Sequence, residues 1–160
     1  MTSLLFVYAV GCAPDPAPPS PSEALAALDP RRPVPLQPMM AWHQKQNMMN
    51  HLVAIQQVVD ALAREDWAGV EAAAKRIGSS PEMQRMCEHM GAGADGFTEA
   101  GLELHERADR IGVAATAQDA PGVLAAISDT LIACTGCHAT YRQDVVDAET
   151  WDAQGRDVSK

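Results

Sequence analysis

The stretch PGVLAAISDTLIACTGCHATYRQDV, residues 121–145, decides the fold class of this chain. Seven of its side chains recur at alternating intervals of three and four residues, which is the spacing of one face of an α-helix. They are Leu124, Ile127, Leu131, Cys134, His138, Tyr141 and Val145. Because proline is tolerated in the first turn of a helix, the pattern predicts a helix from Pro121 to about Asp147. A cysteine and a histidine would lie on its apolar face.

Three further amphipathic segments precede this one. Apolar stripes predict helices around residues 48–62, 66–77 and 98–115, with a short helix opened by Ser80-Pro81 between the last two. Four amphipathic helices joined by short connections most readily form an antiparallel four-helix bundle. The sequence therefore predicts an all-α domain of this kind over residues 39–148, followed by a C-terminal tail over residues 149–160.

The composition supports a helical fold and limits the classes of partner. Hydrophobic residues make up 47% of the 160 residues, but Trp, Tyr and Phe number only three, two and two. That is few for a domain that would normally fill part of its core with rings. The net charge of −9 and the lack of a Lys and Arg stripe exclude a nucleic-acid binder. They also disfavour anionic membrane surfaces, whereas a basic protein partner is compatible with them.

The first residues have the features of an export signal. Residues 1–11 carry no charge and include an apolar run over residues 4–10. The tetrapeptide Ala9-Val10-Gly11-Cys12 resembles the lipobox of bacterial lipoproteins, in which the cysteine is lipidated. We therefore expect a lipoprotein-type signal peptide over residues 1–11 and a periplasmic protein held to the membrane only through a lipid on Cys12. Ordinary secretion and an incidental apolar segment are the alternatives.

The next segment is rich in proline. Nine of the eleven prolines lie within residues 13–38, a density that opposes helix and sheet and favours extended chain. The sequence thus predicts a flexible tether over residues 12–38.

The motif that carries chemistry is Cys134-Thr135-Gly136-Cys137-His138, the Cys-x-x-Cys-His attachment signature of c-type haem. Positions i, i+3 and i+4 of a helix share one face. The two thiols can therefore form thioethers to the haem vinyl groups while the imidazole binds the iron, and we expect one covalent haem c. A thioredoxin-type dithiol, a plain disulfide and a structural zinc site are the alternatives. The fourth zinc ligand would come from Cys87, His51, His89 or His105.

The residues around this motif resemble the cytochrome c-prime family, including its cytochrome c-556 branch. The resemblance rests on a helical domain with a single Cys-x-x-Cys-His in its last helix, followed by Ala139-Thr140-Tyr141-Arg142. It implies an antiparallel four-helix bundle, often dimeric, with the haem between the helices and His138 as the proximal iron ligand. Arg142 is then a candidate contact for a haem propionate or a cover for the proximal imidazole.

In that family the residue opposite the proximal histidine comes from the first helix. An apolar residue there leaves the iron five-coordinate, and a methionine makes it six-coordinate. Met48 is in helical register with Leu52 and Ile55, whereas Met49 has the family spacing from a basic residue, Lys45. We expect Met48 to be the distal ligand, with Met49 as the alternative. Otherwise both methionines only pack in the core, as this flexible side chain often does.

These residues predict an electron carrier and not an enzyme. A haem with His138 and Met48 as axial ligands would carry single electrons outside the cytoplasm, exchanging them with a redox partner protein. That partner could be basic, and the protein could form a homodimer. The alternative function is a five-coordinate haem that binds nitric oxide or carbon monoxide. A third reading, a haem-free helical interaction module, requires the motif to be accidental.

Overall fold

The structure is a computed structural model that describes residues 18–155. The chain divides into two compact units, Met1–Pro30 and Arg31–Lys160. The first unit contains helix α1 (Pro21–Leu28), which has no buried residues and whose N-cap, Ser20, accepts a hydrogen bond from the backbone N–H of Glu23. This helix interrupts the extended tether predicted for residues 12–38. The reason is that Pro21 stands in the first helical turn and the next proline is Pro30.

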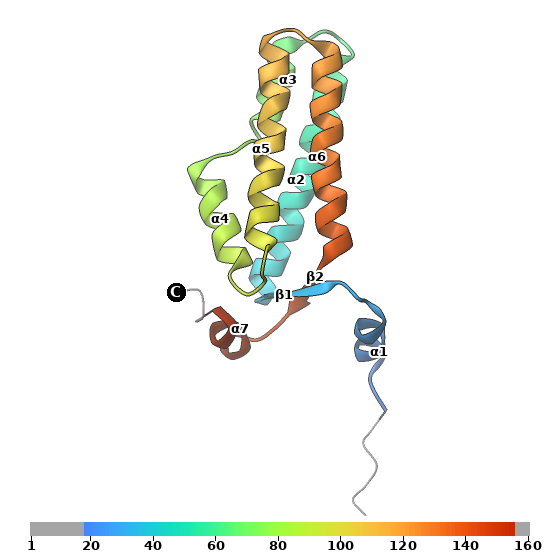
Figure 1. Cartoon of the computed structure of the whole chain (residues 1–160), viewed down its shortest axis with the longest axis vertical. Helices are drawn as coiled ribbons and strands as arrows, with labels where there is room; N and C mark the ends of the chain where they lie inside the picture. The colour runs from blue at the N-terminus through green and yellow to red at the C-terminus, as the bar shows by residue number, and fades with distance from the viewer. Residues whose placement is uncertain (1–17, 156–160) are drawn as a thin grey trace, which may run out of the picture. The chain divides into compact units, whose positions relative to one another are not determined.

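The second unit is predominantly helical, which confirms the predicted helical class, and it adds a small two-stranded sheet (Figure 1). Helix α3 packs against α2 and α5, and α4 packs against α5. The long helices α5 and α6 lie side by side in Figure 1 and make the most extensive contact between elements. In chain order the elements are β1 (Arg32–Leu36), α2 (Pro38–Leu62), α3 (Trp67–Ala74), α4 (Pro81–Gly91), α5 (Phe97–Thr116), α6 (Ala120–Thr140), β2 (Tyr141–Val145) and α7 (Ala148–Gly155).

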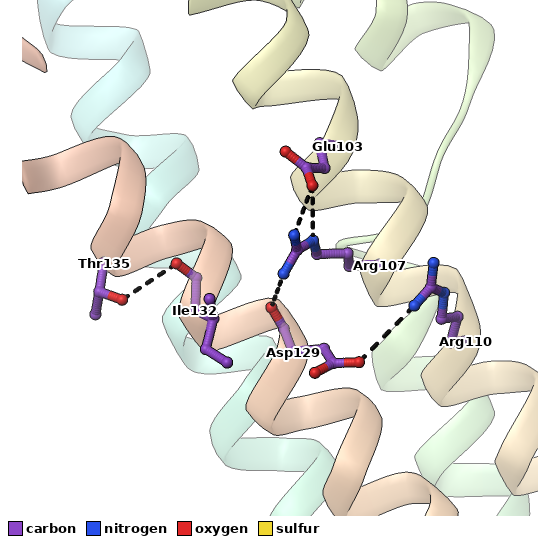
Figure 2. Close-up of polar contacts among 6 residues, drawn as sticks. All are labelled: Glu103, Arg107, Arg110, Asp129, Ile132 and Thr135. Atoms are coloured by element: carbon purple, nitrogen blue, oxygen red, sulfur yellow. Dashed lines mark hydrogen bonds and ion pairs between the residues drawn. The ribbon is translucent and has the colours of Figure 1, made fainter. Parts of the chain in front are cut away.

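Two arginines of α5 join it to α6 (Figure 2). Arg107 donates to the backbone carbonyl of Asp129 at 3.2 Å and also pairs with Glu103 on its own helix. Arg110 lies 3.8 Å from the carboxylate of Asp129. Because these side chains are partly or largely exposed, the pairs contribute little to stability by themselves. They link neighbouring turns of α5 and α6.

The start of α4 follows its sequence signal, whereas the start of α5 differs from the position that the sequence predicts. The hydroxyl of Ser80 accepts a hydrogen bond from the backbone N–H of Met83 and caps α4, as predicted. The sequence places the start of the next helix at about residue 98, and α5 begins at Phe97, after Gly96 with a φ of 78°. A left-handed residue at this cap favours glycine. The hydroxyl of Thr98 donates to the carbonyl of Cys87 on α4.

The prediction that the last helix reaches Asp147 is wrong, because α6 ends at Thr140 and residues 141–145 form strand β2. This strand pairs in parallel with β1, in a register that places Arg32 opposite Tyr141 and Leu36 opposite Val145. The backbone of residues 141–145 therefore forms strand hydrogen bonds with residues 32–36 instead of continuing the helix. The folded unit consequently includes β1, which the sequence had assigned to the tether.

The buried faces of α2 and α6 are rotated from the predicted stripes. On α6 the buried residues include Val123 and Ala126, whereas Leu124 and Leu131 are 55% and 40% exposed. On α2, Leu52 of the predicted stripe is 60% exposed. Leu52 and Leu131 both line the cavity described below, so these apolar side chains lie where that cavity opens to solvent.

The core consists of two clusters. The larger one holds small aliphatic side chains of α2, α3, α5 and α6, including Val58, Val70 and Ile111. The smaller one gathers Leu36 and Tyr141 from the strands with residues of the neighbouring helices. Residues from both clusters line a single cavity, which therefore lies between them.

Helix α6 also meets the length and composition criteria of a membrane span, with a mean hydropathy of 1.4. A helix that forms part of a protein core passes the same test. Helix α6 packs along α5 and places Val123 and Ala126 in the larger cluster, so the fold buries part of its apolar surface. Of the apolar window, 22% is buried.

Candidate functional site

A cavity of about 490 Å³ lies among α2, α4, α5 and α6. Protein interiors normally hold few voids larger than a water molecule, and small-molecule sites occupy about 300–1,000 Å³. The lining is mainly apolar, and among the residues that the structure describes it contains no aspartate or glutamate. It includes eight sulfur-containing side chains: Met48, Met49, Met83, Met86, Met90, Cys87, Cys134 and Cys137. The cavity therefore has the size and the lining of a site for a large apolar group.

The Cys-x-x-Cys-His motif lies in the last turns of α6, and all three of its chemical residues line the cavity. Cys134 and Cys137 are partly exposed free thiols. Burial raises the pKa of both thiols, and the neighbouring Cys134 adds to the effect at Cys137. Redox-active dithiols have a lowered pKa, so this environment does not suit a thioredoxin-type reaction. His138 is exposed and lies one residue beyond Cys137 at the cavity wall.

The structure bears on the zinc alternative as well. Among residues 18–155, no group of three or more His, Cys, Asp or Glu side chains is placed to hold a metal ion. Cys87, His51 and His105 line the cavity but do not converge with the motif on one point. His89 faces elsewhere, with its ring centre 5.3 Å from that of Trp151. A structural zinc site built on the motif is therefore not formed in the described residues.

Both methionines that the sequence proposed as distal ligand line the cavity from α2. Met48 is partly buried, whereas Met49 is 57% exposed. Residues of α2 and α6 line the same cavity, so both thioethers border the space that the motif borders. Met48 is thus the more buried of the two candidates.

Charged side chains are scarce at this site. Lys45 is the one Lys or Arg among the described residues that line the cavity. Arg142, the predicted propionate contact, does not line it. Arg142 lies on β2 with its guanidinium 3.3 Å from the carboxylate of Asp144, and its buried Nε has no hydrogen-bond partner among residues 18–155. Lys45 is therefore better placed than Arg142 to meet an anionic group in the cavity.

Two histidines meet inside the cavity. The ring centres of His51 on α2 and His105 on α5 are 5.3 Å apart, at an interplanar angle of 86°. The Nδ1 atom of His105 is hydrogen-bonded to the backbone carbonyl of Ile77 at 2.5 Å. Burial, together with the nearby His105, lowers the pKa of His51 to about 4. The ring of His51 is thus neutral near neutral pH.

Two arginines at the start of β1 lie near the C-terminal end of α6 and the strand that follows it. The guanidinium of Arg31 donates to the backbone carbonyl of His138 at 3.2 Å. Arg32 donates to the carbonyl of Asp95 at 2.8 Å, and its guanidinium lies 5.2 Å from the ring centre of Tyr141. Sequence reasoning missed these residues because prolines surround them. The alternation of Val34 and Leu36 with proline was the available signal for a strand.

Comparison of the chain with protein-family models, with curated proteins and with solved structures finds no match. The geometry of the site therefore carries the functional argument alone. Cys12 and the rest of the predicted signal peptide lie outside the described residues.

Proposed function

We propose that the chain is a monohaem c-type cytochrome that carries single electrons, with its long helices arranged as an antiparallel four-helix bundle around the haem. One observation carries the proposal. Cys134, Cys137 and His138, in the order and spacing of a haem attachment motif, line a cavity of about 490 Å³ that faces Met48 and Met49 across the fold. If the motif were unrelated to a ligand, nothing would require it to border a cavity of this size.

The residues of the site suit this cofactor. Cys134 and Cys137 would hold the ring through thioethers, and both lie in the cavity wall as thiols of raised pKa. The imidazole of His138 would bind one face of the iron and the thioether of Met48 the other, with Met49 as the alternative. Haem supplies a one-electron iron couple. Mixed histidine and methionine ligation raises its potential relative to two histidines, as suits an electron carrier.

The rest of the lining would exclude water from the cofactor and limit the movement of the bound ring. The side chains of Met83, Met86 and Met90 on α4 cover one side of the cavity. Flexible thioethers adapt to the outline of a bound group. The ammonium group of Lys45, at the edge of the cavity, would attract a propionate.

The setting proposed for this carrier is extracytoplasmic. The predicted signal peptide would direct the chain to the periplasm, where haem c is expected. A lipid on Cys12 would hold the protein at the membrane. The net charge of −9 favours a basic redox partner.

Spectra of the purified full chain test the proposal. We expect haem that resists acid-acetone extraction, and a Cys134→Ser/Cys137→Ser variant that lacks it. A matched Cys87→Ser variant should keep the haem, because Cys87 lines the same cavity outside the motif. A parent protein without covalent haem would contradict the proposal.

The same spectra separate the two haem functions. An electron carrier with methionine ligation has a low-spin ferric spectrum with a far-red methionine–iron band, and carbon monoxide does not change its reduced spectrum. A high-spin spectrum that shifts with carbon monoxide would instead support the gas-binding alternative.

A further inference from the structure

Gln44 is a buried polar side chain in the wall of the cavity. It belongs to α2, it is only 6% exposed, and it lines the cavity together with Lys45. Met48, the proposed distal ligand, follows one helical turn later, and residues four apart share a helix face. A buried amide is costly unless its donors and acceptors have partners. The partners of Gln44 therefore bear on what the cavity binds.

The strand that follows α6 fixes the orientation of this amide. On β2, Nε2 of Gln143 donates to the backbone carbonyl of Ala41 at 3.2 Å and to Oε1 of Gln44 at 2.6 Å. Because a backbone carbonyl can only accept a hydrogen bond, Gln143 must present its nitrogen to Ala41. Gln44 must then present its oxygen to that same nitrogen. The Nε2 of Gln44 consequently points away from Gln143.

This Nε2 is a donor without a partner among residues 18–155. It is not sealed inside the protein. In that part of the chain, the one fully enclosed side-chain nitrogen or oxygen that lacks a hydrogen bond is Nε of Arg142. Because Gln44 is buried and lines the cavity, the open space beside its Nε2 is the cavity. A donor of fixed orientation therefore faces a ligand bound there.

The surroundings of the donor indicate the kind of group that it binds. The ammonium group of Lys45 borders the same cavity, and the described part of the lining contains no carboxylate. A carboxylate of the ligand would accept a charge-assisted hydrogen bond from the amide and be attracted by the lysine. Haem carries carboxylates at its periphery, as its propionates. Since Gln44 lies a full turn from Met48, it is placed to meet the periphery of the ring and not the iron.

We propose that Gln44, held in this orientation by Gln143, donates a hydrogen bond to a propionate of the haem. The contact rests on the proposed haem function and adds a ligand-binding residue to it. Gln44 would touch the carboxylate, whereas Gln143 would act through Gln44 as a positioning residue. The register of the sheet, which places Gln143 opposite Val34, would thereby help to orient the cofactor.

Porphyrin binding by the full chain with Cys134→Ser and Cys137→Ser tests the contact. The probes are haemin and haemin dimethyl ester, which has no free carboxylate, and absorbance titration gives a dissociation constant for each. Gln44→Glu keeps an oxygen for Gln143 and replaces the free donor by an acceptor. We expect it to lower the affinity for haemin at least about 10-fold, as loss of a hydrogen bond to a charged group does. The affinity for the ester should not change.

Gln143→Glu tests the positioning role. A carboxylate only accepts hydrogen bonds, so it would draw Nε2 of Gln44 away from the cavity and lower the affinity for haemin in the same selective way. Gln46→Glu is the matched control, because Gln46 is exposed on the same helix and does not line the cavity. It introduces the same charge and should bind both probes as the parent does.

Unchanged haemin affinity in a folded Gln44→Glu variant would overturn the contact, as would an equal loss of affinity for haemin and the ester. Either result, in a chain whose motif carries covalent haem, would leave the proposed function intact. A chain without covalent haem whose serine variant still prefers haemin to the ester, and loses that preference in Gln44→Glu, would contradict the function and support the contact.

Circular dichroism establishes that each variant is folded. Should the serine background not fold or not bind haemin, the three glutamate variants are made in the haem-loaded chain. The propionate bending bands of its resonance Raman spectrum respond to hydrogen bonding at the carboxylate. They should shift in Gln44→Glu and Gln143→Glu but not in Gln46→Glu, and unshifted bands in Gln44→Glu would overturn the contact.

Discussion

Arg31 donates a hydrogen bond to the backbone carbonyl of His138, the residue that ends the Cys-x-x-Cys-His motif, with Nη1 and O 3.2 Å apart. That carbonyl belongs to the last turn of α6, where backbone acceptors lack helical partners. A cation at this end of a helix also interacts favourably with the helix dipole. The first residue of the folded unit is thereby joined to the residue proposed to bind iron.

Replacement of Arg31 measures this contact. Because the contact is exposed, Arg31→Ala should lower the free energy of unfolding by only about 0.3–1 kcal/mol. Urea denaturation followed by circular dichroism gives the difference. Arg85→Ala, on the exposed side of α4, is the matched control and should differ from the parent by less. An equal loss in both variants would show that the contact with His138 is not a specific one.

Strand β1 can be tested as part of the core. Leu36 is fully buried in the smaller cluster, so Leu36→Ala should cost about 2–5 kcal/mol through lost burial and the cavity left behind. Leu28, on α1, is 80% exposed, and Leu28→Ala should leave the unfolding free energy within about 0.5 kcal/mol of the parent. Equal stability of the two variants would show that residues 32–36 do not belong to the core and form part of the tether.

Loss of haem should loosen the fold. The Cys134→Ser/Cys137→Ser chain would retain a large void between the two core clusters. We expect it to be less stable than the haem protein by about 2–5 kcal/mol, as when a large buried group is removed. It should also bind hydrophobic dyes, as loosely packed states do. The comparison is made with Cys87→Ser, which keeps the motif; a serine double variant as stable as that control would contradict the expectation.

The axial methionine can be identified by separate substitutions. Met48→Leu removes the thioether of the more buried candidate and should convert the ferric haem from low spin to high spin, with loss of the far-red band. Met49→Leu should leave that spectrum unchanged. The assignment must be reversed if only Met49→Leu makes the iron high-spin.

Acid should destabilise the chain through His51. Its pKa is about 4 in the folded protein against 6.5 when unperturbed, so the unfolded state binds the extra proton. Stability is therefore full above about pH 6.5, falls as the pH approaches 4 and changes little below it through this group. Within residues 18–155, no carboxylate lines the cavity to compensate the charge. We expect a loss of up to about 3 kcal/mol, measured by denaturation across this range.

A leucine at position 51 should remove that pH dependence. His43→Leu, on the exposed side of α2, is the control and should preserve it. A parental slope in His51→Leu would assign the acid sensitivity to other groups.

The sequence predicted the helical class, because that depends on local patterns. Of the residues it proposed for the haem site, Cys134, Cys137, His138, Met48 and Met49 line the cavity and Arg142 does not. The helix start at Ser80 and the position of the motif on a helix follow from capping and periodicity. The strands could not be predicted in the same way. Tyr141 and Val145 continue the helical spacing of α6, and only the distant β1 decides that they form a strand. The contact of Arg31 with His138 likewise depends on residues far apart in the chain.

The α6 stripe shows a second limit. Leu131 belongs to the apolar repeat, but its side chain is 40% exposed because it borders the cavity and not the packed core. Periodicity identifies apolar positions, yet it does not distinguish a core residue from one at the edge of a ligand site.

The parallel ladder between β1 and β2 has a mechanical consequence. Tension applied to the chain before Arg31 would enter the folded unit at β1. The first noncovalent contacts to resist it would be those of Arg31 with the His138 carbonyl and of Arg32 with the ring of Tyr141. The start of the folded unit and the end of the motif would therefore move together. A pull on Arg31 would therefore load the proposed iron ligand at the end of α6 directly.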